Sequence, residues 1–134
     1  MKYRLVDILA CPYDKKFPLE LYVFKVEKYE KRELKLIREP MCEKYCAYHR
    51  KPVEELESAP PCRECMKYEV VEGLFYCDIC GRWYPIVDEI PIFLPDEIRG
   101  KRKKDDLEFL KKHKDEIPDK ILKEGKPWSL GSSP

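Results

Sequence analysis

A cysteine knuckle followed directly by an apolar segment is the feature that most constrains this chain. The knuckle occupies residues 77–82 (CDICGR), and the segment after it occupies residues 83–95 (WYPIVDEIPIFLP). A Cys-x-x-Cys turn presents two ligands from one rigid loop, as tetrahedral zinc requires. The segment that follows is extended and carries no recognisable catalytic group. These features predict a metal-stapled platform that binds a partner, rather than an enzyme.

The composition indicates a small hydrophobic core that needs additional cross-links. Of the 134 residues, 40% are charged and 43% are hydrophobic, and seven are cysteines. Small domains with a limited core are commonly stabilised by metals or disulfides. The formal net charge is only +1, whereas a self-sufficient nucleic-acid binder ordinarily has a clear basic excess.

The sequence contains no long apolar run that could cross a membrane. No run approaches about 20 residues, so no transmembrane span is expected. We expect a cytoplasmic protein that makes no membrane contact. In that reducing compartment, cysteines are more often metal ligands than disulfides.

The apolar pattern predicts an α+β fold. Alternating apolar residues predict a strand within residues 17–26. Residues 68–77 are expected to form a strand, a turn at Gly73 and a second strand. Three short helical segments are expected, at residues 3–9, 105–114 and 118–125.

The segment after the knuckle is expected to form a hairpin. Residues 83–87 and 90–94 are extended and flank Asp88 and Glu89. Pro91 has no backbone N–H to donate to a sheet. The second arm of the hairpin is therefore expected at a sheet edge.

The remaining cysteines can pair with this knuckle in two ways. In the first, one zinc ribbon takes its ligands from two Cys-x-x-Cys pairs: Cys62, Cys65, Cys77 and Cys80. The eleven residues between these pairs are close to the usual ribbon spacing. In the second, a core site draws on both halves of the chain: Cys11, Asp14, Cys77 and Cys80. The cysteines between them then form a second metal site or disulfides: Cys42, Cys46, Cys62 and Cys65.

The role of Asp14 depends on the pairing. Residues 11–15 (CPYDK) are similar to a Cys-Pro-x-Cys-Lys knuckle whose second ligand has become Asp14, and carboxylate is an acceptable zinc ligand. In the ribbon pairing, Asp14 only caps a turn and Cys11 is a small buried apolar residue. In either case four protein ligands close the site, so the metal is expected to be structural.

Two segments of the chain together resemble one protein family. Residues 5–12 (LVDILACP) resemble the opening of the multifunctional methyltransferase subunit family, the archaeal-like tRNA methyltransferase 112 homologues. Residues 77–94 resemble its closing half. The chain departs from the family at Asp14, where cysteine is expected, and at Glu89, where glycine is common.

The resemblance implies a domain organisation. A small zinc-ribbon-like antiparallel sheet is formed by both chain ends, with Cys11, Cys77 and Cys80 in its core site. We therefore expect three parts: a zinc-binding β platform (1–26 and 67–99), a Cys-rich insertion (27–66) and a charged, partly helical C-terminal tail (100–134).

The resemblance also implies a function. Family members are not enzymes; they bind and activate methyltransferases that modify tRNA, ribosomal RNA or translation release factors, and the partner holds S-adenosylmethionine. We accordingly expect one or two structural zinc ions, a heterodimer formed by strand addition or apolar contact, and only indirect contact with RNA. The expected partner-binding residues follow the second cysteine pair: Trp83, Tyr84, Ile86, Ile90, Pro91, Ile92, Phe93 and Leu94.

Two rival functions follow from the same cysteines. A stand-alone nucleic-acid-binding zinc ribbon would bind RNA or DNA in a salt-sensitive way, and the near-neutral charge weighs against it. A rubredoxin-like electron carrier would use iron in place of zinc, and Asp14 stands where its fourth knuckle cysteine would be.

Overall fold

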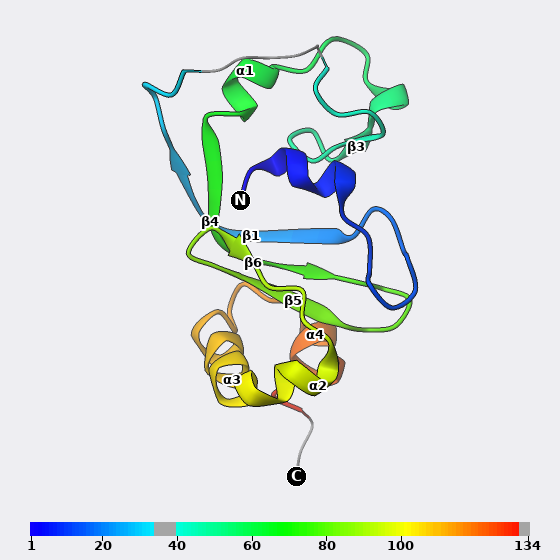
Figure 1. Cartoon of the computed structure of the whole chain (residues 1–134), viewed down its shortest axis with the longest axis vertical. Helices are drawn as coiled ribbons and strands as arrows, with labels where there is room; N and C mark the ends of the chain where they lie inside the picture. The colour runs from blue at the N-terminus through cyan, green and yellow to red at the C-terminus, as the bar shows by residue number, and fades with distance from the viewer. Residues whose placement is uncertain (34–39, 132–134) are drawn as a thin grey trace.

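A four-stranded antiparallel sheet lies at the middle of the molecule, between a cysteine-rich layer and a layer of helices (Figure 1). The computed structural model describes residues 1–33 and 40–131, so parts of the predicted insertion (34–39) and tail (132–134) lie outside the described residues. This mixed architecture confirms the predicted α+β class.

The elements in chain order, with η for 3-10 helices, are η1 (Tyr3–Ile8), β1 (Glu20–Lys28), β2 (Tyr45–Cys46), β3 (Lys51–Pro52), η2 (Val53–Glu55), α1 (Cys62–Cys65), β4 (Tyr68–Tyr76), β5 (Trp83–Val87), β6 (Ile90–Pro91), α2 (Asp96–Arg99), η3 (Gly100–Arg102), α3 (Lys103–Lys112) and α4 (Asp119–Glu124).

Strand β4 continues through Gly73 without a break, so the predicted turn at that residue is wrong. The strand order is β1-β4-β5-β6, and β1 pairs with β4 along its whole length, with register shifts on both sides of Lys25. A Cβ atom on residue 73 would lie 2.4 Å from the carbonyl oxygen of Tyr22. Glycine is therefore needed here because the neighbouring strand comes unusually close, and not because the chain turns.

Strands β5 and β6 form the predicted hairpin at the sheet edge. Val87 pairs with Ile90, and the two residues between them, Asp88 and Glu89, have φ angles of 48° and 69°. Two residues with positive φ match a type I′ turn, whose twist suits a tight hairpin. The hairpin is thus made with two non-glycine residues in the left-handed region. Pro91 lies in the outermost strand, as predicted.

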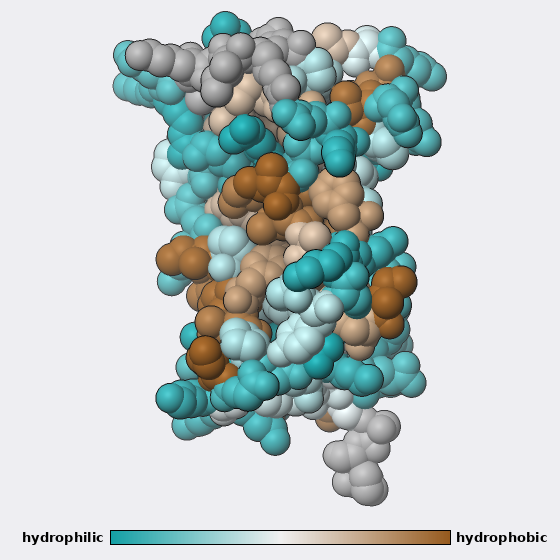
Figure 2. All heavy atoms as spheres, turned by 45° about the vertical axis from the view of Figure 1, so that its right-hand side comes forward, coloured by the Kyte–Doolittle hydropathy of each residue, from teal (hydrophilic) through white to brown (hydrophobic). Residues whose placement is uncertain are grey.

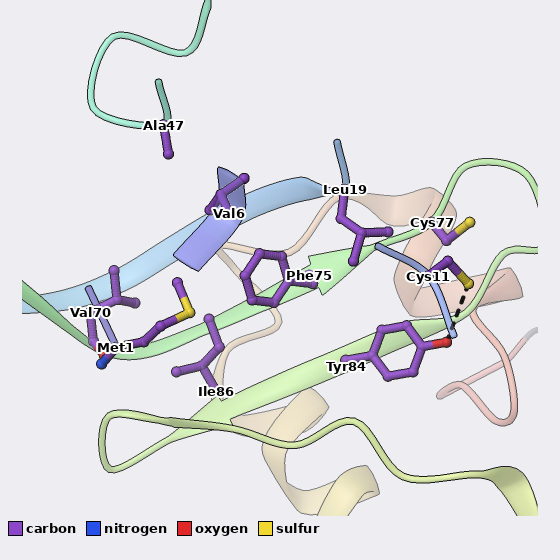
Figure 3. Close-up of a cluster of buried hydrophobic side chains, with 10 residues drawn as sticks. All are labelled: Met1, Val6, Cys11, Leu19, Ala47, Val70, Phe75, Cys77, Tyr84 and Ile86. Carbon is purple, nitrogen blue, oxygen red and sulfur yellow. Dashed lines mark hydrogen bonds between the residues drawn. The ribbon is translucent and has the colours of Figure 1, made fainter. Parts of the chain in front are cut away.

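The sheet separates two hydrophobic cores. Successive residues of a strand point to opposite faces, so the neighbours Trp83 and Tyr84 of β5 are buried in different cores. The core between the sheet, η1 and the insertion includes two cysteines (Figure 3): Met1, Val6, Cys11, Leu19, Ala47, Val70, Phe75, Cys77, Tyr84 and Ile86. The core between the sheet and the helices consists of Leu74, Trp83, Phe109, Leu110, Ile117 and Ile121.

The helices after residue 95 pack directly against the sheet. Helices α3 and α4 lie where helices were predicted. The fully buried Arg99 donates to the Trp83 carbonyl and, at 2.8 Å, to the Asp106 carboxylate, which also accepts from the Trp128 indole at 3.2 Å. The described part of the predicted tail therefore shares a core with the platform. Every helix in the described ranges is too short or too polar to traverse a lipid bilayer.

Candidate metal centre

The first knuckle, residues 11–16, is a tight loop closed by two backbone hydrogen bonds. The Cys11 N–H donates to the Lys16 carbonyl at 3.0 Å, and the Lys15 N–H donates to the Cys11 carbonyl at 2.9 Å. Lys15 has a φ of 66°, in the left-handed region. The Lys16 N–H also donates to the Asp14 carboxylate at 2.9 Å, which fixes the direction of that side chain.

The second knuckle, residues 77–82, has the same backbone pattern. The Cys77 N–H donates to the Arg82 carbonyl at 2.9 Å, and the Gly81 N–H donates to the Cys77 carbonyl at 2.9 Å. Gly81 has a φ of 79°. Arg82 then forms a two-point ion pair with Asp96, at 3.2 and 2.8 Å, which ties this knuckle to the start of α2.

The two knuckles face each other and bring four metal-ligating side chains together. One ligand atom from each of Cys11, Asp14, Cys77 and Cys80 lies within 4.8 Å of the other three. The sulfur atoms of Cys11 and Cys80 are 3.7 Å apart, and the Cys77 sulfur lies 3.2 Å from the nearer Asp14 oxygen. Cys11 and Cys77 are fully buried, Cys80 is half-buried and Asp14 is exposed.

The electrostatics of the site fit a bound cation. Burial disfavours the Cys11 thiolate, but hydrogen bonds from the Asp14 N–H, the Tyr84 hydroxyl and the Tyr13 N–H outweigh burial and lower the Cys11 pKa. Burial raises the pKa of Cys77 to about 12, and its thiol donates to the Asp14 carboxylate. A hydrogen bond from the Lys16 N–H is the main cause that lowers the Asp14 pKa. Three sulfur atoms and one carboxylate thus lie close together, and a bound cation would favour the deprotonated form of each.

The donor set fits zinc. Three sulfur atoms and one carboxylate oxygen are all accepted zinc ligands, and four protein ligands from two knuckles make a closed, tetrahedral type of site. A closed site leaves no coordination position for a substrate. The contribution of a metal held by Cys11, Asp14, Cys77 and Cys80 would therefore be structural, because it would join the N-terminal segment to the β4–β5 connection.

The metal centre is in contact with the sheet through Tyr84. Figure 3 shows the Tyr84 ring lying beside Cys11, with the hydroxyl 3.5 Å from the sulfur. The Tyr84 ring is also stacked on Phe93, with ring centroids 4.5 Å apart. Sequence reasoning did not identify Tyr84 as a neighbour of the metal ligands. Its position after the knuckle was visible in the sequence, but the face of β5 on which it lies was not.

The predicted partner-binding residues divide into two groups. Trp83, Tyr84 and Ile86 are 0% exposed, so they form no surface of the isolated chain, and their role in partner binding stays a prediction. They are buried because both faces of β5 are covered, one by the helices and the other by η1 and the insertion. The remaining five lie at the open edge, where Ile90 is 62% exposed and the others are half-buried: Pro91, Ile92, Phe93 and Leu94.

The insertion's cysteines lie away from the second knuckle. All seven cysteines of the chain are free thiols. Cys42, Cys46, Cys62 and Cys65 line one cavity together. Burial and then the charges of Cys46, Cys42 and Cys62 raise the pKa of Cys65 to about 12, as expected for thiols crowded together. The structure therefore groups the cysteines as in the second pairing, and does not join Cys62 and Cys65 to the second knuckle as the ribbon pairing required.

Asp7 is a second feature that sequence reasoning missed. Its carboxylate accepts three backbone N–H groups of the insertion, from Glu43, Lys44 and Tyr45, each at 2.8 Å. The available signal was an acidic residue within the apolar run of residues 5–10.

Comparison with known proteins adds the family. A family model described as Trm112p-like protein matches residues 2–89, well over half of the chain. The chain belongs to the Trm112p-like family. The search among curated proteins found no match. Both knuckles of this Trm112p-like chain lie inside the matched range, which ends at Glu89 in the hairpin turn. Members of the Trm112p-like family are known as activators of methyltransferases.

Proposed function

We propose that this Trm112p-like chain is a non-catalytic subunit that binds and activates methyltransferases dependent on S-adenosylmethionine. The substrates of those partners would be tRNA, ribosomal RNA or a translation release factor. The observation that carries the proposal is the family match over residues 2–89, because it includes both knuckles and the strands that they connect. The cofactor would be bound by the partner, and RNA would meet this chain only through the partner.

The open sheet edge supports partner binding. We call residues 90–94 the edge segment. Strand β6 is the last strand of the sheet, and the Ile92 N–H faces inward, donating to the Pro85 carbonyl at 2.9 Å. The opposite side of the segment has no neighbouring strand within the described residues. Such an edge can pair with a partner's strand, in which backbone hydrogen bonds give affinity and alternate side chains give specificity.

Exposed apolar side chains add to the surface available to a partner. Figure 2 shows apolar side chains gathered across the middle of one face, between polar bands above and below. The large apolar residues that are most exposed include Ile8 (63%), Ile79 (66%) and Ile90 (62%). Covering such side chains would contribute to binding through the hydrophobic effect, at about 25 cal/mol per Å² of apolar surface.

The core site has a defined role in this proposal. A zinc ion held by the two knuckles would fix the position of Cys11. Cys11 contacts Tyr84, and Tyr84 is stacked on Phe93 of the edge segment, so these contacts connect the core site to the edge. The ion would therefore keep the edge in the conformation that a partner recognises, without taking part in methyl transfer.

Affinity purification from the source cells tests the proposal. The tagged chain is expected to recover one or more methyltransferases in stoichiometric amounts, as identified by mass spectrometry. An Ile90→Asp variant should lose them, because it places a charge on the edge segment. The matched control is Val26→Asp, since Val26 is 39% exposed on β1 at the opposite edge of the sheet. Recovery of RNA or ribosomes without any methyltransferase would instead support a free-standing zinc ribbon.

A further inference from the structure

We propose that the insertion is a second metal site, in which Cys42, Cys46, Cys62 and Cys65 bind one zinc ion as four thiolates. We call these four residues the insertion site. The site is separate from the core site, and it stands or falls independently of the partner-binding function.

The four cysteines surround one small cavity. The cavity has a volume of about 20 Å³, and Met41 and Ala47 contribute to its wall. A volume of about 10–15 Å³ is enough for one water-sized particle. The cavity therefore has room for a single ion and not for an organic ligand. Cys46 and Cys62 are buried, and Cys42 and Cys65 are half-buried, so the sulfur atoms are largely withdrawn from solvent.

Each half of the insertion site is positioned by its own backbone structure. Cys42 and Cys46 lie on either side of the loop whose N–H groups are bound by Asp7, and Cys46 ends strand β2. Cys62 and Cys65 begin and end α1, where the Met66 N–H donates to the Cys62 carbonyl at 2.9 Å. Residues three apart in a helix lie on the same face. Two ligands from a loop and two from a helical turn are thus directed at one cavity.

The insertion has few other means of holding its shape. Strands β2 and β3 have two residues each, and α1 has four. A two-stranded hairpin is marginal in water, and segments this short need a cross-link. Among the described residues 40–66, the buried side chains are two of the four cysteines and three apolar residues: Met41, Cys46, Ala47, Pro60 and Cys62. Together with the three hydrogen bonds to Asp7, a metal ion bound by the four cysteines would supply the cross-link that such short elements need.

The insertion site is more open than the core site. Within the described part of the chain, the core site is the group whose ligand atoms all lie within 4.8 Å of one another. The four sulfur atoms of the insertion site do not all lie that close together. Zinc–sulfur bonds of about 2.3 Å place the sulfur atoms of a tetrahedral site nearer than that. Binding would therefore draw Cys42 and Cys46 toward α1 and tighten the insertion.

Metal content of the full chain, purified without oxygen, tests the proposal. We expect two zinc ions per chain by inductively coupled plasma mass spectrometry. A Cys62→Ser/Cys65→Ser variant should lose one ion and retain the core one. The matched control is His49→Ala, since His49 is exposed beside the insertion site and should not affect the count. Loss of an ion from the His49 variant would overturn the four-thiolate assignment.

Cobalt titration keeps the test decisive if the cysteine variants do not fold. The wild-type chain should take up two equivalents of Co²⁺, with thiolate-to-cobalt absorption that continues to rise through the second equivalent. Saturation at one equivalent would overturn the proposal. Mass spectrometry of the unreduced chain gives the other contrary outcome, because disulfides joining Cys42, Cys46, Cys62 and Cys65 would leave no thiolates for a metal.

Discussion

The two knuckles of the core site have the same backbone and different side chains. In each knuckle, the N–H of the first cysteine donates to the carbonyl of the residue five positions later. The carbonyl of the same cysteine accepts a hydrogen bond from the N–H of the residue four positions later. In each, the fifth residue has positive φ, yet it is Lys15 in the first knuckle and Gly81 in the second. The fourth residue differs as well, Asp14 against Cys80. The two loops thus share one backbone, as expected if each presents two metal ligands at a fixed angle, and they differ in the second candidate ligand.

The side chains around each knuckle differ in a way that matches the ligands. In the first, Asp14 is exposed and its carboxylate is held by the Lys16 N–H. In the second, Cys80 is half-buried, and Arg82 holds the loop against Asp96. The exposed carboxylate of Asp14 thus stands opposite the half-buried sulfur of Cys80. The first knuckle is therefore expected to be the weaker half of the site.

Removal of a buried cysteine should have the largest effect. A structural zinc ion contributes about 10–16 kcal/mol, which is as large as the whole stability of a domain, about 5–15 kcal/mol. Cys77→Ser is therefore expected to release the metal and abolish cooperative unfolding, as followed by metal analysis and thermal circular dichroism. Cys11→Ser should do the same in the other knuckle. A cooperative, zinc-free Cys77→Ser protein with an unchanged Tm would show that neither knuckle depends on metal.

Changing Asp14 should have a smaller effect on metal affinity. One ligand of four accounts for about 3 kcal/mol, or on the order of 100-fold in affinity. Asp14→Ala should therefore weaken zinc binding by about that factor in a competition assay with a coloured chelator. Asp14→Cys should strengthen binding, because it makes the first knuckle's ligands equal to those of the second. Equal affinities for wild type, Asp14→Ala and Asp14→Cys would mean that Asp14 is not a ligand.

The sequence allowed much of this site to be predicted. Spacing alone placed Asp14 at the position of a missing cysteine and paired both knuckles as one alternative, because metal ligands must recur at short, fixed intervals. The hairpin after the second knuckle followed from its apolar arms and Pro91. What spacing could not decide was which cysteines meet in space. That depends on the β1–β4 pairing, which carries the first knuckle to the second.

Two predictions differ from the structure, each for its own physical reason. A strand buried on both faces has apolar residues at every position, so periodicity does not reveal which side chains remain exposed. The family resemblance placed Trp83 and Tyr84 at a partner surface, and the apolar pattern could not show that each is buried in a core. Gly73 looked like a turn because an isolated glycine can mark either a turn or a close backbone approach. Only the neighbouring strand distinguishes the two.

Adding a side chain to Gly81 should cost moderate stability. A Cβ atom there meets nothing within 4 Å, so the cost comes only from the φ of 79°. A left-handed non-glycine residue costs about 1–2 kcal/mol, so Gly81→Ala should lower Tm by about 3–8 °C. Gly100→Ala is the matched control, because that position also has open space but an ordinary helical φ of -54°. Equal effects of the two substitutions would rule out backbone strain as the cause.

Lys15→Gly should have the smallest effect and the opposite sign. It gives the first knuckle the glycine of the second, relieving about 1–2 kcal/mol of left-handed strain. The gain is partly offset by the greater freedom of glycine in the unfolded chain, about 0.5–1 kcal/mol, and by loss of the exposed hydrogen bond from Lys15 to the Pro12 carbonyl. A net stabilisation of about 0.5 kcal/mol is expected from chemical denaturation of the metal-bound protein. If Lys15→Gly instead destabilises as much as Gly81→Ala, the lysine contributes something that the shared backbone does not require, and the equivalence of the two loops fails.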